Sequence, residues 1–179
     1  MLTHQQQSFI AEVSSPGADL NFLDVLLGQP VKIMLPGTGG GVFSGRFNYR
    51  DDSHLLSHQA STQSPPVLTL YFSHTDKGYL LYVRSSGPQF DKAISSCPSG
   101  AIGAFHPDEV APTHFEIVGP KGPVTLSDIG ASQFTCLLRD HKSGNCVHRS
   151  RRHDSSHIYL FSNQNEQLPF RVKILERNI

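Results

Sequence analysis

Short apolar runs separated by turn residues follow one another along most of the chain. Each run has four to six residues, mostly rich in Val, Ile, Leu, Phe and Tyr, and is bounded by Gly, Pro, Ser, Asn or Asp. Alternation is clearest from Phe170 to Ile174, where Phe, Val and Ile fall on one face of an extended segment and Arg and Lys on the other. This pattern is typical of half-buried β-strands, so we predict an all-β protein.

The runs recur in three copies with shared spacing. The copies begin at Val31, Tyr79 and Phe134, and in each copy further runs start eleven, twenty-two and thirty-six residues on. Four strands in about forty residues make either a propeller blade or one lobe of a closed barrel. Three blades are too few, because a propeller typically has about 4–8. Three lobes around one barrel, in contrast, leave no exposed sheet edge.

With this triplication the chain resembles the β-trefoil superfamily over roughly residues 31–175. The resemblance lies in the repeat architecture and not in any single family. It implies a β-trefoil domain of residues 31–179, with four-stranded repeats at 31–72, 79–118 and 134–175. The alternative is a β-sandwich in which the shared spacing is a coincidence.

Residues 1–30 lie outside these repeats, and we predict that they form an N-terminal extension packed on the barrel. Within it, Asp19–Leu27 places three leucines on one side of a short helix, and Gly28 is suited to end that helix. The first residues lack the features of a signal peptide, and no apolar run approaches the length of a membrane span. The location is left open between the cytoplasm and secretion without a recognisable signal peptide.

The formal net charge is zero at pH 7, but the charges are unevenly distributed. Residues 134–179 carry eight Lys or Arg against four Asp or Glu, whereas residues 1–133 carry seven against eleven. The basic residues concentrate in the run His148–His153. This run is either a solvated hairpin or a surface for an anionic partner such as a sulfated glycan, phosphate or a lipid headgroup. Nucleic acid is not expected, because the run lacks interleaved aromatic residues for base stacking.

One polar pattern occurs at equivalent positions of two copies. Asp51 with His54, and Asp154 with His157, both read Asp-x-x-His at the start of the third run, and the second copy lacks both groups. A carboxylate acceptor beside a flat ring suits the paired hydroxyls of a sugar. The neighbours that we expect to add donors and an apolar face are Tyr49, Arg50, Arg152 and His153.

Lectins of the β-trefoil type commonly keep sites in some lobes and lose them in others, so the resemblance implies two glycan sites here. The chain has no Trp, however, and therefore lacks the Gln-x-Trp signature of ricin-type lectins. Asp51 and Asp154 can equally well be caps of their turns. The runner-up function is recognition of a protein receptor or protease, as an inhibitor, a secreted effector or the targeting domain of a toxin.

Enzyme activity is not predicted. The run Gly37–Gly41 lacks the Gly-Lys-Ser/Thr ending of a phosphate-binding loop, and the chain has no G-x-S-x-G elbow. The H-x-x-x-H spacing of two histidine pairs brings both rings to one face only on a helix, and these segments are expected to be loop and strand. We therefore predict no cofactor and no metal. The three cysteines form no C-x-x-C pair and are expected to be free thiols, although Cys136 and Cys146 can face each other across a hairpin.

Overall fold

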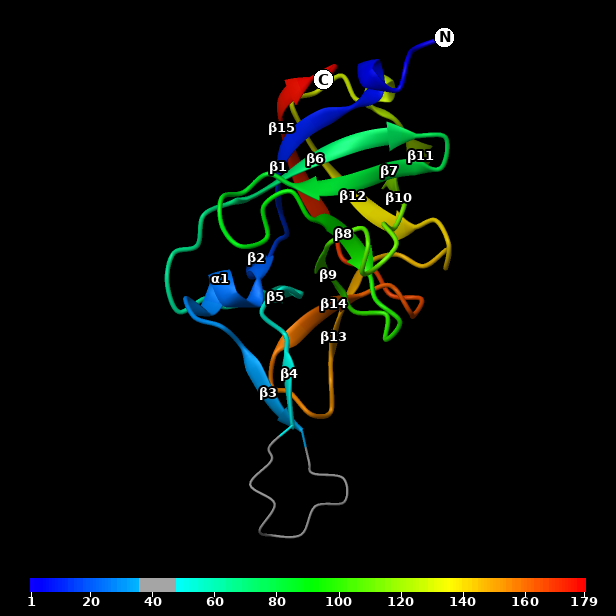
Figure 1. The fold of residues 1–179 in the computed structure, drawn as a ribbon. Coiled ribbons are helices and arrows are strands. Elements are labelled where there is room, and N and C mark those ends of the chain that lie inside the picture. The colour runs from blue at the N-terminus through cyan, green and yellow to red at the C-terminus, as the bar shows by residue number, and fades with distance from the viewer. Residues whose placement is uncertain (36–47) are drawn as a thin grey trace, which may run out of the picture.

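The computed structural model describes residues 1–35 and 48–179, and these residues form an all-β protein (Figure 1). The run Gly37–Gly41 lies outside the described residues. The strands are β1 (Phe9–Ser14), β2 (Asp19–Phe22), β3 (Lys32–Leu35), β4 (Asn48–Asp51), β5 (Leu56–Gln59), β6 (Leu68–Thr75), β7 (Gly78–Val83), β8 (Ala93–Ser96), β9 (Ile102–Phe105), β10 (Phe115–Gly119), β11 (Gly122–Val124), β12 (Gln133–Asp140), β13 (His148–Arg151), β14 (Ile158–Phe161) and β15 (Phe170–Arg177). The helical elements are α1 (Leu23–Leu27) and the short 3-10 helices η1 (Gln5–Gln7) and η2 (Leu126–Asp128).

Six antiparallel strands close into a barrel. Their order is β1, β6, β7, β10, β12 and β15, and β15 pairs again with β1. The pairing of Tyr79 with Phe115 joins β7 to β10 and closes the ring. Because every strand of this ring has a neighbour on both sides, no barrel edge is left unpaired.

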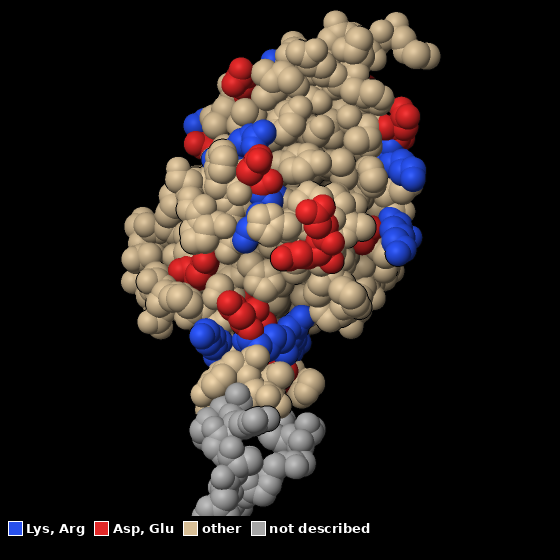
Figure 2. Space-filling view, in the orientation of Figure 1, with Lys and Arg blue, Asp and Glu red and all other residues tan. Residues whose placement is uncertain are grey.

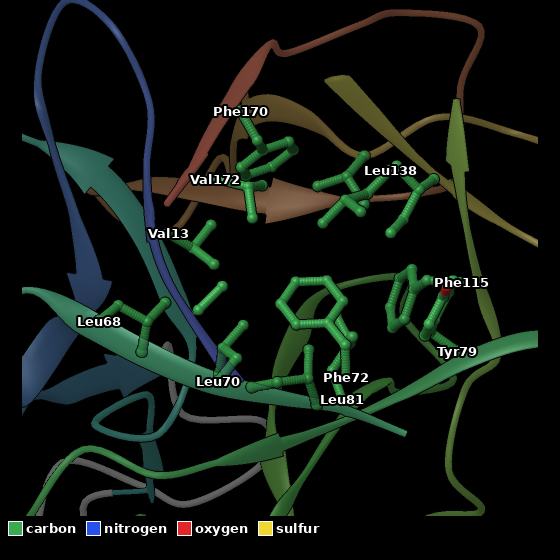
Figure 3. Packing of buried hydrophobic residues seen from close by; sticks show 14 of the residues in the cluster. Val13, Leu68, Leu70, Phe72, Tyr79, Leu81, Phe115, Leu138, Phe170 and Val172 are labelled. Atoms are coloured by element: carbon green, nitrogen blue, oxygen red, sulfur yellow. The ribbon is translucent and has the colours of Figure 1, made fainter. Parts of the chain in front are cut away.

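Apolar side chains fill the barrel (Figure 3). Phe9 stacks on Phe72 with ring centroids 4.5 Å apart, and Tyr79 lies edge-on to both rings. The Tyr79 hydroxyl is also satisfied, since it accepts a hydrogen bond of 3.0 Å from the backbone N–H of Leu126. Burial of each such ring stabilises the folded state by about 1.5–3 kcal/mol.

Three further strand pairs cover one end of the barrel: β2 with β5, β8 with β9, and β13 with β14. In the sequence, each pair lies between two barrel strands. The chain thus divides into a first segment (residues 9–75), a second (78–119) and a third (133–177). The inner strands contact one another in a triangle, through the bridges Leu55–Gly103, Ala101–Phe161 and Ser57–Tyr159.

The first segment corrects the sequence-based boundaries. Val31–Leu35 was expected to open the first repeat, but among the described residues β3 pairs only with β4, and neither strand belongs to the barrel. The barrel strand is β1, which lies between β15 and β6. Thus β1 and β2 are integral to the sheets and do not form an extension outside them. The β3–β4 hairpin is inserted in the sequence between β2 and β5. Its apolar runs have the same spacing as those of the other copies, which is why the sequence pattern placed the first repeat there.

The remaining strand positions follow the prediction more closely. The strands β10 and β15 begin at Phe115 and Phe170, where the fourth runs of copies two and three were placed. The predicted helix is shorter than expected, because Asp19–Phe22 is strand β2, and α1 ends at Gly28 in the left-handed region with φ of 70°. All three cysteines are free thiols. No helix of the described residues is long and apolar enough to cross a membrane.

Candidate functional site

Arg50 fastens the β3–β4 hairpin to the third segment. Its Nε and Nη2 donate to the two carboxylate oxygens of Asp52 at 2.7 and 3.0 Å. Its Nη1 and Nη2 donate to the two oxygens of Asp154 at 2.7 and 3.0 Å. These hydrogen bonds raise the pKa of Arg50, and the Arg50 guanidinium holds the pKa of Asp154 below its ordinary value. Paired N–H donors of this kind fix orientation as well as distance.

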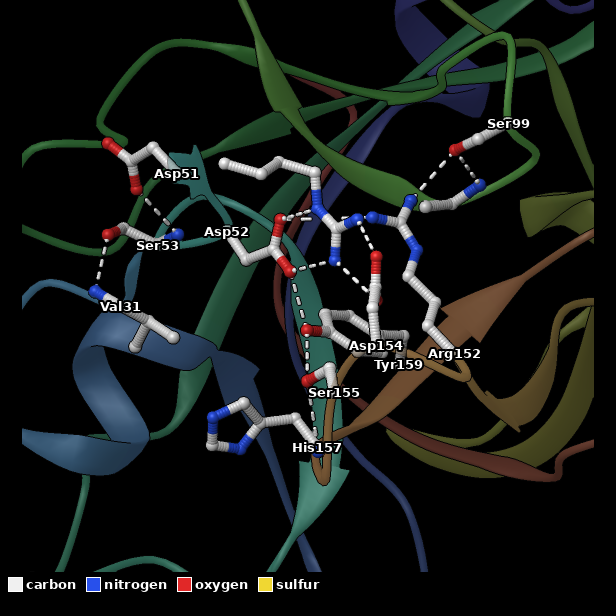
Figure 4. A network of polar contacts seen from close by, with 12 residues as sticks. Val31, Asp51, Asp52, Ser53, Ser99, Arg152, Asp154, Ser155, His157 and Tyr159 are labelled. Carbon is white, nitrogen blue, oxygen red and sulfur yellow. Dashed lines mark hydrogen bonds and ion pairs between the residues drawn. The ribbon is translucent and has the colours of Figure 1, made fainter. Parts of the chain in front are cut away.

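Asp52 is the centre of this network, which Figure 4 shows together with its neighbours. Its side chain is 1% exposed and also accepts a hydrogen bond of 2.5 Å from the Tyr159 hydroxyl. Arg152 lies 3.8 Å from the same carboxylate, and it donates to Ser99 Oγ at 2.8 Å. Burial, with the bond to Asp52, raises the pKa of Tyr159 to about 12. The buried charge is therefore compensated on several sides, as a charge out of contact with water must be.

An open pocket of about 580 Å³ lies beside this network. We call it the arginine pocket. Six of the eight residues predicted for the site line it: Arg50, Asp51, His54, Arg152, His153 and Asp154. Its other lining includes the rings of Phe105 and Phe161 and the polar side chains of Ser99, Asn163 and Gln164. The His54 ring lies edge-on to Phe105 with centroids 5.0 Å apart, and burial lowers the pKa of His54.

The two Asp-x-x-His motifs are not equivalent in the structure. Asp51 caps its turn by accepting the backbone N–H of Ser53 at 2.9 Å, and hydrogen bonds from Ser53 lower the pKa of Asp51. Asp154 instead binds Arg50. Both carboxylates line the same pocket, so the arrangement differs from the two separate sites that the resemblance implied.

Two predicted residues lie away from the arginine pocket. His157 Nδ1 is 3.2 Å from Gln59 Nε2, and its ring lies edge-on to Tyr159. Tyr49 pairs with Met34 across the hairpin and is 54% exposed. Neither residue lines the pocket.

Asp52 is the site residue that sequence reasoning missed. The sequence pattern predicts Asp51, whose offset within the copy equals that of Asp154, yet it is Asp52 and Asp154 that share Arg50. A usable signal was present, because alternate residues of an extended segment share a face and Arg50 precedes Asp52 by two positions. The pocket amides and rings carry no comparable signal, since they come from turns and strands far apart in the sequence.

The basic run of the third segment is only partly a solvated surface. Figure 2 shows Lys and Arg gathered at the end of the molecule from which the β3–β4 hairpin projects. Arg149 donates to the backbone carbonyl of His58 at 3.2 Å. The Arg152 guanidinium lies 5.2 and 5.7 Å from the ring centroids of Tyr159 and Phe161. Two arginines of the run are thus held by other parts of the fold, while Arg151 is exposed at the pocket. Residues 1–35 and 48–179 contain no cluster of three or more His, Cys, Asp or Glu suited to a metal ion.

Comparisons with known proteins give a likeness of fold but no family. No protein-family model matches the sequence, and no curated protein matches it significantly. Among solved structures, the chain is similar to the crystal structure of the lysenin pore, with a TM-score of 0.51 and 5% sequence identity. The likeness covers 93% of this chain and 45% of the lysenin chain. This chain therefore spans less than half the length of that neighbour, and the likeness concerns the fold alone.

Proposed function

We propose that the chain is a non-enzymatic binding module of the β-trefoil type, and that its arginine pocket takes a neutral carbohydrate. The observation that carries the proposal is the pocket itself, in which three arginines and three aspartates face the same space beside two phenylalanines. Six of its residues were singled out from the sequence alone.

The trefoil part of the proposal rests on the strand pairings. Each of the three segments supplies two barrel strands that flank one strand pair in the sequence. The three inner strands then bridge one another in a triangle. A sandwich of two stacked sheets has no closed six-stranded ring of this kind.

Charge balance favours a neutral ligand over an anionic one. Arg50 already donates to two carboxylates, and Arg152 lies next to Asp52. A sulfate or phosphate would have to compete with these aspartates and would lie close to them. Sugar hydroxyls, in contrast, both donate and accept, so they can bond to carboxylates, guanidinium groups and amides together.

The residues that line the pocket also suit both the hydroxyl groups and the C–H face of a sugar. Asp51 Oδ1 accepts the backbone N–H of Ser53, and the carboxylate has further lone pairs that can accept hydrogen bonds from ligand hydroxyls. Asn163 and Gln164 supply amides with both donor and acceptor atoms. The rings of Phe105 and Phe161 provide an apolar surface for the C–H face of a sugar ring.

An array of neutral glycans tests this function. The wild-type chain should bind members of the array, and Asp51→Asn should weaken that binding about tenfold or more through loss of a charged acceptor. Asn can retain the turn cap, so circular dichroism and the unfolding midpoint should stay unchanged. The matched control is Asp108→Asn, since Asp108 is exposed and does not line the pocket. A blank array with folded protein, or equal binding by both variants, would reject the proposal.

Recognition of a protein partner is the second candidate. It is favoured by the likeness to part of the longer lysenin chain, because a module of this size can serve as the targeting part of a larger protein. Under this alternative the glycan array stays blank, and a pull-down recovers a defined protein whose binding is reduced by Arg151→Ala, at an exposed pocket residue.

A further inference from the structure

A larger depression lies beside the arginine pocket, between the second and third segments. This second hollow has a volume of about 1280 Å³. Cys97, Ser99 and Asn163 line both the arginine pocket and the second hollow, so the two are adjacent. Residues found only in the second hollow include Lys77, Glu109, His114, His141, Lys142 and Asn145.

The floor of the second hollow is fixed by hydrogen bonds. Asp140 is 5% exposed, and its Oδ1 accepts the backbone N–H of Lys142 at 2.9 Å. Its Oδ2 accepts the hydroxyl of Ser162 at 3.0 Å. Thr113 and Ser96 also line the hollow, and Thr113 Oγ1 accepts the backbone N–H of Ser96 at 2.9 Å. Side chains on a floor held in this way need little reordering when a ligand binds.

The charged residues that line the second hollow are balanced in number. Lys77 and Lys142 are matched by Glu109 and the buried Asp140. The side-chain amides of Asn145 and Asn163 have no hydrogen-bond partner among the residues that the structure describes. The arginine pocket and the second hollow therefore both have balanced charges, and both offer hydrogen-bond donors and acceptors.

We infer that the arginine pocket and the second hollow form one groove for a linear, neutral oligosaccharide. One end of the sugar chain occupies the pocket beside Asp51, and the following units pass Asn163 and reach Asn145. The inference rests on the proposed function and extends it from a sugar to a chain of sugars. Volume supports the extension, because sites for single small molecules measure about 300–1,000 Å³ and the second hollow alone exceeds that range.

The test is the dependence of affinity on chain length. The probes are homo-oligomers of glucose, mannose, galactose or N-acetylglucosamine, each with about one to six units, followed by calorimetry on the series that binds. Affinity should rise about tenfold or more from the single sugar to the longest chain, as added units gain hydrogen bonds. Asn145→Ala should remove most of this gain and leave the affinity for the single sugar unchanged.

Two further variants keep the result interpretable. Lys142→Ala changes an exposed side chain of the second hollow and should also reduce the gain with length. Asn165→Ala is the matched control, because Asn165 is exposed and lines neither hollow. Affinity that is independent of length, or a gain that survives both Asn145→Ala and Lys142→Ala, would overturn the extended groove and leave the proposed function standing. Failure of every oligomer to bind would reject the proposed function itself.

Discussion

Strand β1 belongs to the barrel, whereas strand β3 belongs to a hairpin outside it. Both are short segments in which partly and more fully covered residues alternate. In β1, Phe9, Ala11 and Val13 are 0%, 0% and 2% exposed, because the strand lies between two barrel neighbours over the core. In β3, Met34 is 59% exposed, and β4 is the one strand that pairs with it in the part of the chain that the structure describes. Alternation thus identifies a strand, while its partners decide whether that strand belongs to the barrel.

The largest expected difference between these two regions is in stability. Phe9→Ala should reduce the free energy of unfolding by about 3–5 kcal/mol, because it removes a buried ring stacked on Phe72 and leaves a cavity. Met34→Ala, on the outer face of the hairpin, should change it by about 0.5 kcal/mol or less. Denaturant unfolding followed by circular dichroism measures both. Equal effects of the two substitutions would mean that β1 is not a core strand.

A smaller effect is expected where the hairpin is fastened to the third segment. Asp52→Ala should cost about 3 kcal/mol, because it leaves the Tyr159 hydroxyl and part of the Arg50 guanidinium without their buried partner. The same denaturant experiment measures it, with Asp108→Ala at an exposed position as the control. A cost no larger than that of the control would show that the network does not fasten the hairpin.

The smallest effect depends on pH. Because Arg50 lowers the pKa of Asp154 in the folded state, the ionised carboxylate contributes its full stabilisation above about pH 4 and loses it as the pH falls through the folded pKa. Wild type and Asp154→Asn should therefore differ by about 1 kcal/mol or less at pH 7, and the difference should shrink toward zero in acid. Unfolding curves from pH 7 down to about pH 2 measure it. A difference that stays constant with pH would contradict the ion pair.

The sequence predicts the second and third segments better than the first for a physical reason. Their strand pairs are joined by short turns, so apolar runs keep an even spacing. In the first segment, α1 and the β3–β4 hairpin intervene between β2 and β5, and counting along the chain cannot distinguish inserted strands from barrel strands. The apolar pattern of β1 is also weak, since the strand contains the small Ala11 and the outward-facing Glu12. The Glu12 carboxylate lies 3.4 Å from Lys173 Nζ.

The sequence can suggest candidate residues where a local pattern repeats, such as Asp-x-x-His. It cannot suggest residues that come together only when the segments pack. The offsets of Asp51 and Asp154 predicted two equivalent sites, whereas in the fold both carboxylates line one pocket. The second hollow is built from ordinary polar residues such as Asn145 and His114, which meet only after the segments pack. No spacing rule connects such positions before the fold is known.

Because β1 pairs with β15, the barrel cannot close during synthesis until the chain has been made as far as β15. Strand β1 cannot pair on both sides before β15 has been made, because Phe9 lies opposite Arg177 in the β1–β15 pairing that closes the barrel. Arg50 likewise meets Asp154 only after 104 further residues have been made. The barrel and the arginine pocket are therefore completed only once β15 has been made, and loss of β15 would leave the unpaired edges of β1 and β12 open to other chains.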